Sequence, residues 1–408
     1  MNVEVIAIGN ELLSGSTVNT NAAFISEQLQ HQGYIVSRHT VLSDEVSQMR
    51  LGFQEALRRS RLVISTGGLG PTCDDLTRNV AAELFGSDFR YDEEIANDIK
   101  RRFGQDAPTI KNQATVPTKA IILRNSIGTA PGMIFQGDGS TLILLPGVPL
   151  EMRAMMLDQV MSYLKTHQEA FPKRYTKRLQ FFGLPESAVD PMLREIKEKH
   201  ANIECGIYPD QGILTVTVSA QASSEEQAEE ILKIPYNFIC SKFSSSVFYS
   251  ATGKLEHAVH EMLLQKGLTL SAAESCTGGV LSAKLTQIPG ASKYFIGSVV
   301  AYSNELKFSL LGVSQDTLSK YGAVSEEVVA EMCLGILKLT GSDYAVAISG
   351  IAGPSGGSPE KPIGTLWCAF GKQGEKPLTW LCQGKGNREM IIKQGANALL
   401  AKIYSMLK

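Results

Sequence analysis

The sequence Ala-Glu-Ser-Cys-Thr-Gly-Gly at residues 273–279 lies between an apolar run at 268–273 and a helical pattern at 280–285. This order predicts a small hydroxyl residue at a turn from a strand into a helix. Such a turn exposes the hydroxyl and directs the free N–H groups of the following helix towards the group that the hydroxyl attacks. A nucleophilic serine requires this geometry. On spacing alone, an ordinary strand-to-helix turn is the more frequent meaning of the pattern, so catalysis is left open at this point.

Length and composition describe a globular protein of several domains. A chain of 408 residues predicts two or three of them. Its 43% apolar and 20% charged residues give a net charge of −2, without the basic excess that a nucleic acid or an anionic membrane would attract. No apolar run reaches the roughly 18–20 residues that span a bilayer, and the chain begins with a strand rather than a signal peptide. We therefore expect a cytoplasmic protein with neither a nucleic-acid nor a membrane partner.

Alternating strands and helices predict the fold. In the N-terminal third, strands are expected at 3–9, 34–42 and 62–65, with helices at 19–30 and 45–59 between them. This alternation indicates a parallel sheet covered by helices on both faces. Ligands bind such sheets outside the carboxyl ends of the strands. The segments 10–15 and 66–75 lie at those ends.

Residues 66–75 form a second Gly-rich turn, Thr-Gly-Gly-Leu-Gly-Pro-Thr-Cys-Asp-Asp. The glycines Gly67, Gly68 and Gly70 allow several backbone N–H groups to face one anion. The carboxylates of Asp74 and Asp75 follow directly, which suits a phosphate bridged by a metal ion. A tight Gly-Pro-Thr turn with Asp74 capping the next helix explains the pattern equally well. The turn is neither a Walker A loop nor a G-x-G-x-x-G motif.

The remainder of the chain predicts two further parts. A β-α-β-β-α order between residues 171 and 250 suits a small split α+β module. It is similar to a KH domain but lacks a G-x-x-G clamp and a basic stripe, so we interpret it as a spacer or dimerisation module. The predicted fold class is α/β, with largely parallel sheets in two α/β domains at 1–170 and 251–408 that this module joins.

The residue types around the first turn limit how a serine there is activated. The six histidines lie away from both Gly-rich turns in the sequence, so a Ser-His-Asp triad is not available. Seven scattered cysteines without a C-x-x-C motif suggest neither a zinc site nor a disulfide framework. The remaining possibility is a lysine base, and Lys307 is the best-placed candidate because it follows a strand that ends in polar residues with Tyr302. Its pKa must fall from about 10.4 by roughly 3 units, which costs on the order of 4 kcal/mol.

Neighbouring residues complete this hypothesis. Tyr302 is expected to relay a proton or to orient the serine–lysine pair, and the N–H groups of Thr277, Gly278 and Gly279 to hold an oxyanion. Arg388, near the start of the last predicted helix, suits a phosphate clamp. The alternatives are a packing role for Tyr302 and a solvated Lys307. Glu274 is expected to cap a helix or to accept from a buried N–H rather than to act as an acid.

The motifs together resemble the CinA family of competence- and damage-inducible proteins. In the N-terminal part the resemblance rests on residues 9–15, 19–21, 66–77, 112–114, 128–132 and 145–152. This part looks like the molybdopterin-binding fold of MoaB and MogA. In the C-terminal part it rests on residues 273–279, 301–304, 322–326 and 349–357. The sequence departs from the family at Asn387, where the family often has Asp, and at Ile392, where it often has Arg.

The resemblance implies two activities. In the N-terminal domain it implies hydrolysis of ADP-ribose to AMP and ribose 5-phosphate. A divalent ion (Mg, Mn or Co) would sit on Asp74 and Asp75, and potassium is a further candidate ion. The substrate-binding residues that it implies there are Glu11, Asn21, Gly67, Gly68, Gly70, Pro146 and Gly147.

In the C-terminal domain the resemblance implies deamidation of nicotinamide mononucleotide (NMN) to nicotinate mononucleotide and ammonia, without a cofactor. The family's catalytic residues fall on Ser275, Tyr302 and Lys307. Its substrate-binding residues fall on Thr277, Gly278, Gly279, Gly353 and Arg388. The family forms homodimers, so a homodimer is expected. Two other interpretations remain: an N-terminal domain that only binds a nucleotide or a pterin, and a non-enzymatic protein associated with competence or DNA repair.

Overall fold

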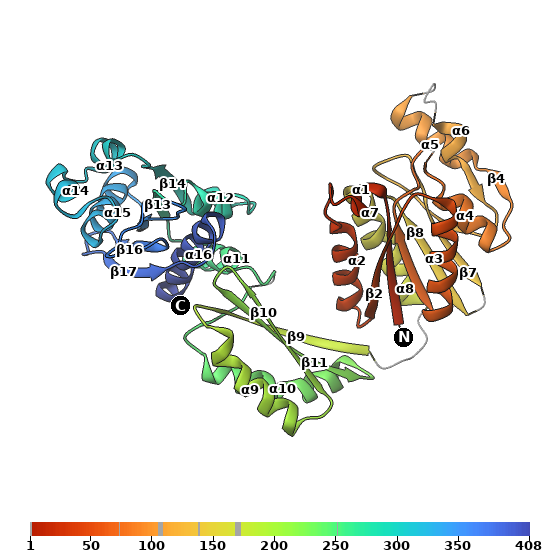
Figure 1. The fold of residues 1–408 in the computed structure, drawn as a ribbon, viewed down its shortest axis with the longest axis horizontal. Helices are drawn as coiled ribbons and strands as arrows, with labels where there is room; N and C mark the ends of the chain where they lie inside the picture. Colours follow the sequence, from red (N-terminus) through yellow and green to blue (C-terminus); the bar gives the residue numbers. More distant parts are fainter. Residues whose placement is uncertain (1, 73, 105–108, 138, 168–172, 251) are drawn as a thin grey trace. The chain divides into compact units, whose positions relative to one another are not determined.

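The computed structural model describes residues 2–72, 74–104, 109–137, 139–167, 173–250 and 252–408 (Figure 1). The chain divides into two compact units, Met1–Thr176 with Ala220–Glu230 and Lys177–Ser219 with Ile231–Lys408. Across the described residues, no helix is both long and apolar enough to cross a membrane.

The N-terminal part is built on a six-stranded sheet in the order β2-β1-β3-β8-β7-β6 (Figure 1). The pairs among β2, β1, β3 and β8 are parallel, whereas β7 and β6 pair antiparallel at one edge. The strands are β1 Asn2–Ile8, β2 Ile35–Leu42, β3 Leu62–Thr66, β6 Ile121–Leu123, β7 Gly132–Gly137 and β8 Ser140–Leu145, with a separate pair β4 Phe89–Tyr91 and β5 Thr115–Pro117. The helices are α1 Asn10–Leu13, α2 Thr20–His31, α3 Val46–Arg59, α4 Thr77–Leu84, α5 Glu93–Phe103, α6 Ile110–Gln113, α7 Pro149–Met155 and α8 Met161–Thr166, with a π-helical turn at Met156–Val160.

Both faces of this sheet are buried, because alternate residues of its apolar strands point to opposite sides. Val5 and Ile64 pack on one face against α2 and α7. Ile6 and Val63 pack on the other face against α3 and α4. The predicted α/β fold with helices on both faces is therefore confirmed. The antiparallel edge was not expected, because the sequence analysis assigned no strand to β6 or β7. The turn between β7 and β8 is too short for the crossover that a parallel pair requires.

The middle part has the predicted β-α-β-β-α order, followed by a short strand, β12, that was not predicted. It comprises β9 Lys173–Phe182, α9 Glu186–Lys199, β10 Ile203–Asp210, β11 Ile213–Ala222, α10 Glu225–Lys242 and β12 Val247–Phe248. The strands form a sheet in the order β10-β11-β9-β12. Helix α10 is longer than the predicted 225–234 and continues through Pro235.

The C-terminal part has a five-stranded sheet in the order β14-β13-β15-β16-β17. The pairs of β13 with β14 and β15 are parallel, and β16 and β17 add antiparallel strands. The strands are β13 Leu270–Glu274, β14 Phe295–Val300, β15 Tyr344–Gly350, β16 Thr365–Lys372 and β17 Leu378–Gln383. The helices are α11 Leu255–Lys266, α12 Val280–Thr286, α13 Asn304–Leu311, α14 Gln315–Tyr321, α15 Glu326–Thr340 and α16 Arg388–Leu407.

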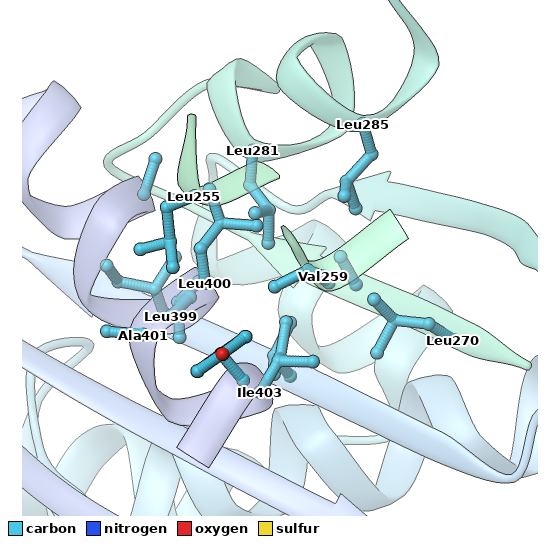
Figure 2. Packing of buried hydrophobic residues seen from close by; sticks show 14 of the residues in the cluster. Leu255, Val259, Leu270, Leu281, Leu285, Leu399, Leu400, Ala401 and Ile403 are labelled. Carbon is cyan, nitrogen blue, oxygen red and sulfur yellow. The ribbon is translucent and has the colours of Figure 1, made fainter. Parts of the chain in front are cut away.

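On one face of this sheet lies the apolar core that holds α12, the helix that follows β13. Figure 2 shows Leu281 and Leu285 of α12 packing towards Val259 of α11 and towards the side chains of α16. The opposite face is covered by α15, with Val328 and Met332 in its core. The apolar residues of α12 thus hold the helix in place, which fixes the position of the end of the turn that leads into it.

The strand predicted at 295–304 is shorter in the structure and ends at Val300. The reason lies in the cap of the next helix. The Ser303 side chain accepts from the Leu306 N–H, and α13 starts at Asn304. Tyr302 therefore lies in the connection between β14 and α13 rather than on a strand.

The core around α16 provides a test of this packing. We expect Leu399→Ala to lower the free energy of unfolding by about 2–5 kcal/mol, because Leu399 is fully buried and the change leaves a cavity. The control Leu381→Ala removes a side chain that is 54% exposed and should change it by less than about 0.5 kcal/mol. The chain has only 2 tryptophans, Trp367 and Trp380 in this sheet, so tryptophan fluorescence in urea follows the C-terminal part. Equal effects of the two substitutions would contradict the assigned core.

Candidate functional site

The turn after β13 holds Ser275 at the carboxyl end of the parallel strands. Its N–H donates to the Ile348 carbonyl of β15 at 3.1 Å, so the neighbouring strand fixes its backbone. Gly278 and Gly279 follow with φ angles of +59° and +96°, a region that side-chain-bearing residues rarely adopt. The two glycines let the chain reverse within five residues and enter α12. Ser275 itself is 7% exposed.

Lys307 lies against this serine. Its Nζ is 3.0 Å from the Ser275 Oγ, 2.8 Å from the Ala301 carbonyl oxygen and 3.4 Å from the Tyr302 carbonyl oxygen. The structure thus brings together the pair that the sequence selected. The side chain comes from α13 and is 1% exposed. The alternative of a solvated lysine is therefore wrong.

The surroundings of Lys307 favour the neutral amine. Burial lowers the pKa of Lys307, an effect that the nearby Cys276 partly opposes. A carbonyl oxygen only accepts hydrogen bonds, so the two carbonyl oxygens bind N–H groups of the lysine. The charged amine donates to the Ser275 Oγ as well. Once it has lost a proton, its two remaining N–H groups can bind the two carbonyl oxygens, and its lone pair can accept from the Ser275 hydroxyl. In this arrangement a neutral Lys307 could take the hydroxyl proton.

Glu274, just before the serine, caps α12 from within the protein. It is fully buried, and its carboxylate accepts from the N–H groups of Gly279, Leu281 and Ser282 at 2.9–3.2 Å. The Ser282 hydroxyl donates to it as well. The N–H groups in the first turn of a helix have no acceptor within the helix, and these bonds provide one. The negative charge of Glu274 is also stabilised by the positive end of the helix dipole. The expected capping role of Glu274 is confirmed.

This cap changes the assignment of the oxyanion donors. The Gly279 N–H donates to Glu274 and the Gly278 N–H donates to the Ser275 carbonyl at 3.0 Å. Neither is free to bind an oxyanion in this conformation, so that part of the prediction is wrong. Within the described residues, no other residue accepts a hydrogen bond from the N–H groups of Cys276 and Thr277. The sequence analysis missed Cys276, although the residue after a nucleophilic serine commonly supplies this donor.

The thiol of Cys276, next to Ser275, is poorly suited to act as a nucleophile. Burial raises the pKa of the Cys276 thiol to about 12, so the thiol stays protonated near neutral pH. Its Sγ would lie 3.1 Å from a Cβ added at Gly350, so the thiol packs against β15. The Lys307 Nζ is hydrogen-bonded to the Ser275 Oγ and not to this thiol. Ser275 is the hydroxyl that Lys307 contacts.

Tyr302 and Arg388 form a second pair at this site. The Arg388 Nη2 donates to the Tyr302 Oη at 2.7 Å and its Nη1 donates to the Gly353 carbonyl at 2.7 Å. The phenol is 59% exposed and, in the described residues, has no hydrogen bond to Ser275 or Lys307. Only the Tyr302 backbone reaches the lysine. The tyrosine therefore orients the arginine rather than the serine–lysine pair.

Arg388 is the first residue of α16, as predicted. The helix is capped by Asn387, whose side chain accepts from the Met390 N–H at 2.9 Å. Asp and Asn serve equally well as N-caps. The departure from the family pattern at this position therefore leaves the start of the helix intact.

The N-terminal part gathers several predicted residues at the carboxyl ends of β1, β3 and β8. The Asn21 Nδ2 donates to the Gly147 carbonyl at 2.8 Å and to the Thr66 Oγ1 at 3.0 Å. Thr66 in turn donates to the Pro146 carbonyl at 2.8 Å. Gly67 has φ +110°, and an added Cβ would lie 2.2 Å from the Ile8 carbonyl oxygen, so only glycine fits there. The Asn21 Oδ1 is buried without a partner among the described residues.

The other predicted residues border this cluster. An added Cβ at Gly68 would lie 2.0 Å from the Thr77 Oγ1, so α4 begins in close contact with the loop. An added Cβ at Gly70 would lie 2.5 Å from the Asp75 Oδ2, so Gly70 is in close contact with this carboxylate. The Glu11 carboxylate folds back over Gly9 at the end of β1.

The acidic pair after the loop does not cap α4. The N-cap residue of this helix is Leu76, so Asp74 is not at the N-cap position that the alternative gave it. Asp75 instead accepts from the Thr72 N–H at 2.9 Å and from the Thr72 hydroxyl at 2.5 Å. The predicted segment 66–75 also contains Cys73, which lies outside the described residues.

A metal ion at the acidic pair would need further ligands. In the described part of the chain, no three His, Cys, Asp or Glu side chains are grouped to hold a metal ion by themselves. Mg²⁺ commonly binds one or two carboxylates together with substrate phosphates. Asp74 and Asp75 provide such carboxylates. We therefore expect the ion to bind together with the phosphate groups of a nucleotide.

Comparisons with known proteins cover nearly the whole chain. The family described as a probable molybdopterin binding domain matches residues 4–166, the damage-inducible protein CinA KH domain matches 176–247 and the CinA C-terminal domain matches 252–407. A CinA-like protein of Kosmotoga olearia is 40% identical over 400 residues, which are 97% of this chain and 96% of that protein. A putative competence-damage inducible protein of Clostridium novyi is 39% identical over 379 residues, 92% of this chain and 91% of its own. A crystal structure of the protein CinA from Thermoplasma acidophilum is 42% identical and covers 40% of this chain and 96% of its own, with a TM-score of 0.37.

The Glu274 cap gives a prediction for the C-terminal site. Glu274→Ala should lower the free energy of unfolding by roughly 2 kcal/mol or more, because it leaves buried N–H groups without an acceptor. Glu274→Gln keeps one acceptor oxygen and should lose less. The control is Glu305→Ala, which removes an exposed carboxylate from the first turn of α13. Unfolding in urea, followed by tryptophan fluorescence, measures all three. A loss for Glu274→Ala no larger than for the control would refute the cap.

Proposed function

Because the chain belongs to the CinA family of competence-damage-inducible proteins, we propose that it is a hydrolase with two active sites. The C-terminal site deamidates NMN, and the N-terminal site hydrolyses ADP-ribose to AMP and ribose 5-phosphate. The observation that carries the first activity is the 3.0 Å contact between the Lys307 Nζ and the Ser275 Oγ. A serine–lysine pair of this kind activates a hydroxyl for attack on an amide.

The deamidation proceeds in two steps. The Ser275 Oγ attacks the carboxamide carbon of NMN while its proton passes to Lys307, and the N–H groups of Cys276 and Thr277 hold the oxyanion. The C–N bond then breaks, and Lys307 returns the proton to the departing ammonia. Lys307 next activates a water molecule, which hydrolyses the ester on Ser275 and releases nicotinate mononucleotide.

Arg388 suits the phosphate of this substrate. It stands at the start of α16, where helix N–H groups and the guanidinium both favour an anion. Its bonds to Tyr302 and Gly353 fix its direction. The pyridinium ring of NMN carries a fixed positive charge, which would lower the pKa of Lys307 further once the substrate binds.

The proposal for the N-terminal site rests on the loop at Gly67–Gly70 and on the acidic pair that follows. Asp74 and Asp75 would hold the divalent ion, and the loop would place backbone N–H groups around the phosphates. The ion would neutralise charge on the diphosphate as its bond is cleaved. Asn21 supports the loop and has a buried acceptor oxygen left for a ligand.

Substitution of Lys307 tests the assigned base. Lys307→Ala and Lys307→Arg should each lower the rate of ammonia release from NMN by at least about 100-fold, since alanine has no base and arginine keeps its proton. Ser275→Ala should abolish the reaction. Lys293→Ala, an exposed lysine, serves as the control. A rate within a few-fold of the wild type for Lys307→Ala would show that another residue is the base.

The pH dependence follows from the same residue. Burial lowers the pKa of Lys307, so its neutral form is present at a lower pH than for a free lysine. Activity requires that form. The kcat/KM for NMN should therefore rise with pH and level off above an inflection that lies below the ordinary lysine value of about 10.4. A profile that falls as pH rises through this range would contradict a lysine base.

The second activity is tested with the acidic pair. Asp74→Ala and Asp75→Ala should abolish divalent-dependent formation of AMP from ADP-ribose and leave NMN deamidation unchanged. Asp88→Ala, an exposed aspartate of the same part, is the control. Full cleavage in chelator would rule out the metal. Ammonia release without AMP formation would indicate an N-terminal domain that only binds, and the absence of both products would favour a non-enzymatic role.

A further inference from the structure

Arg78 is a buried cation that makes no ion pair with any described residue. It is 9% exposed, and its Nη1 and Nη2 donate to the backbone and side-chain oxygens of Asn112 at 2.9 and 2.7 Å. Its Nε is buried and donates to nothing among the described residues. Both acceptors are neutral amide oxygens. The positive charge is therefore hydrogen-bonded, but no carboxylate of the described chain compensates it by direct contact.

Two other charges in the same unit, one buried and one partly buried, are compensated. Glu4 is 1% exposed and pairs with Arg59 at 3.0 Å. Arg102, which is 23% exposed, pairs with Asp98 at 2.6 Å. Burial of an unpaired charge is costly, so proteins that keep one usually use it to bind a charged ligand or a metal. Arg78 differs from both, because no carboxylate of the described residues contacts its guanidinium and only the charge of Asp75 acts on it from a distance.

The position of Arg78 on its helix also favours the binding of an anion. It lies in the first turn of α4, directly after the Gly-rich loop. A cation is unfavourable at the positive end of a helix, whereas an anion there is stabilised by the helix and by the arginine together. Within the described residues, the N–H groups of Arg78 and Asn79 have no hydrogen-bond partner. The start of α4 thus offers an anion both N–H groups and a guanidinium.

A second unpartnered group lies beside the loop. Gln113 is fully buried, and its Nε2 donates to the Leu69 carbonyl at 3.2 Å. Its Oε1 has no partner among the described residues. The adjacent Asn112 holds Arg78, so the short helix α6 fixes both the arginine and the Gly-rich loop. An acceptor in this place suits a hydroxyl group of a ligand.

We infer that Arg78 binds a phosphate group in the N-terminal site and that Gln113 accepts a hydrogen bond from a hydroxyl of the same ligand, which is a nucleoside diphosphate. Asp75, whose charge acts on Arg78, marks the acidic side of the site, where a metal ion would bind. The guanidinium then takes phosphate oxygens that the ion does not. The choice of ADP-ribose as this ligand rests on the proposed function. A purely structural role for Arg78, linking α4 to α6, is the competing explanation.

Binding without cleavage separates these explanations. Isothermal titration calorimetry with ADP-ribose in chelator measures affinity in the absence of metal-dependent turnover. Every protein in this experiment is the full chain with Arg388→Gln. This substitution removes the arginine that we propose binds phosphate in the C-terminal site. Into this chain we introduce Arg78→Gln, Arg78→Lys or, as a control, Arg101→Gln, whose side chain is 78% exposed. Adenosine, which has no phosphate, is titrated in parallel.

We expect Arg78→Gln to weaken ADP-ribose binding by about 10–100-fold, the loss typical of a hydrogen bond to a charged group, and to leave adenosine binding unchanged. Arg78→Lys keeps the charge but loses the planar fork, so its affinity should lie between those of Arg78→Gln and the parent chain. Gln113→Leu should weaken ADP-ribose binding less than Arg78→Gln does. The control should bind as the parent chain does.

Equal affinity for ADP-ribose in the parent chain and in either folded Arg78 variant would overturn the inference. An equal loss of affinity for ADP-ribose and adenosine would overturn it too, because it would indicate a structural role. Circular dichroism checks folding, and Arg78→Lys serves as the test if Arg78→Gln does not fold. If the wild type binds ADP-ribose through Arg78 in chelator but forms no AMP with added metal, the proposed cleavage fails and the inference stands. Cleavage by a chain whose affinity does not depend on Arg78 would instead support the proposed function and overturn the inference.

Discussion

The contact between Lys307 and Ser275 depends on the exclusion of water from both side chains. A lysine in water keeps its proton until about pH 10.4 and would be useless as a base near neutrality. Burial in the interior behind β13 and α13 disfavours the charged form. The carbonyl oxygens of Ala301 and Tyr302 hold the amine towards the serine. The shortened strand β14 is what provides these carbonyls, because the chain turns away from the sheet just where the lysine needs acceptors.

The turn that carries Ser275 is stabilised from the residue beside it. Glu274 uses its carboxylate to bind the first N–H groups of α12, so the strand end and the helix start form one rigid unit. Leu281 and Leu285 then hold the helix in the apolar core (Figure 2). The cost of this arrangement is that the Gly279 N–H is no longer available for an oxyanion. The role passes to the N–H groups of Cys276 and Thr277, from which no other described residue accepts a hydrogen bond.

The buried charged residues of the protein differ in how their charge is compensated. This difference distinguishes the residues with a structural role from those at the two candidate sites. Glu274 is satisfied by backbone N–H groups, and Glu4 is neutralised by Arg59. Both have structural roles. Lys307 is moved towards its neutral form, whereas Arg78 keeps a charge that no described carboxylate contacts. These two groups lie at the carboxyl ends of parallel strands, where α/β sheets bind their ligands.

Local apolar periodicity and the placement of glycine were enough to predict the α/β class, the alternation of the first strands and helices, the β-α-β-β-α order of the middle part and the two Gly-rich turns. The amino-acid pattern also selected Ser275 and Lys307, since the lack of a nearby histidine left few ways to activate a serine. Only the three-dimensional fold determined which side chains contact one another. The pairing of Tyr302 with Arg388, the engagement of Gly279 by Glu274 and the buried charge of Arg78 depend on residues far apart in the chain or on where a side chain turns. The antiparallel sheet edges belong to the fold as well, because strand direction follows from how the chain returns and not from the pattern of any single strand.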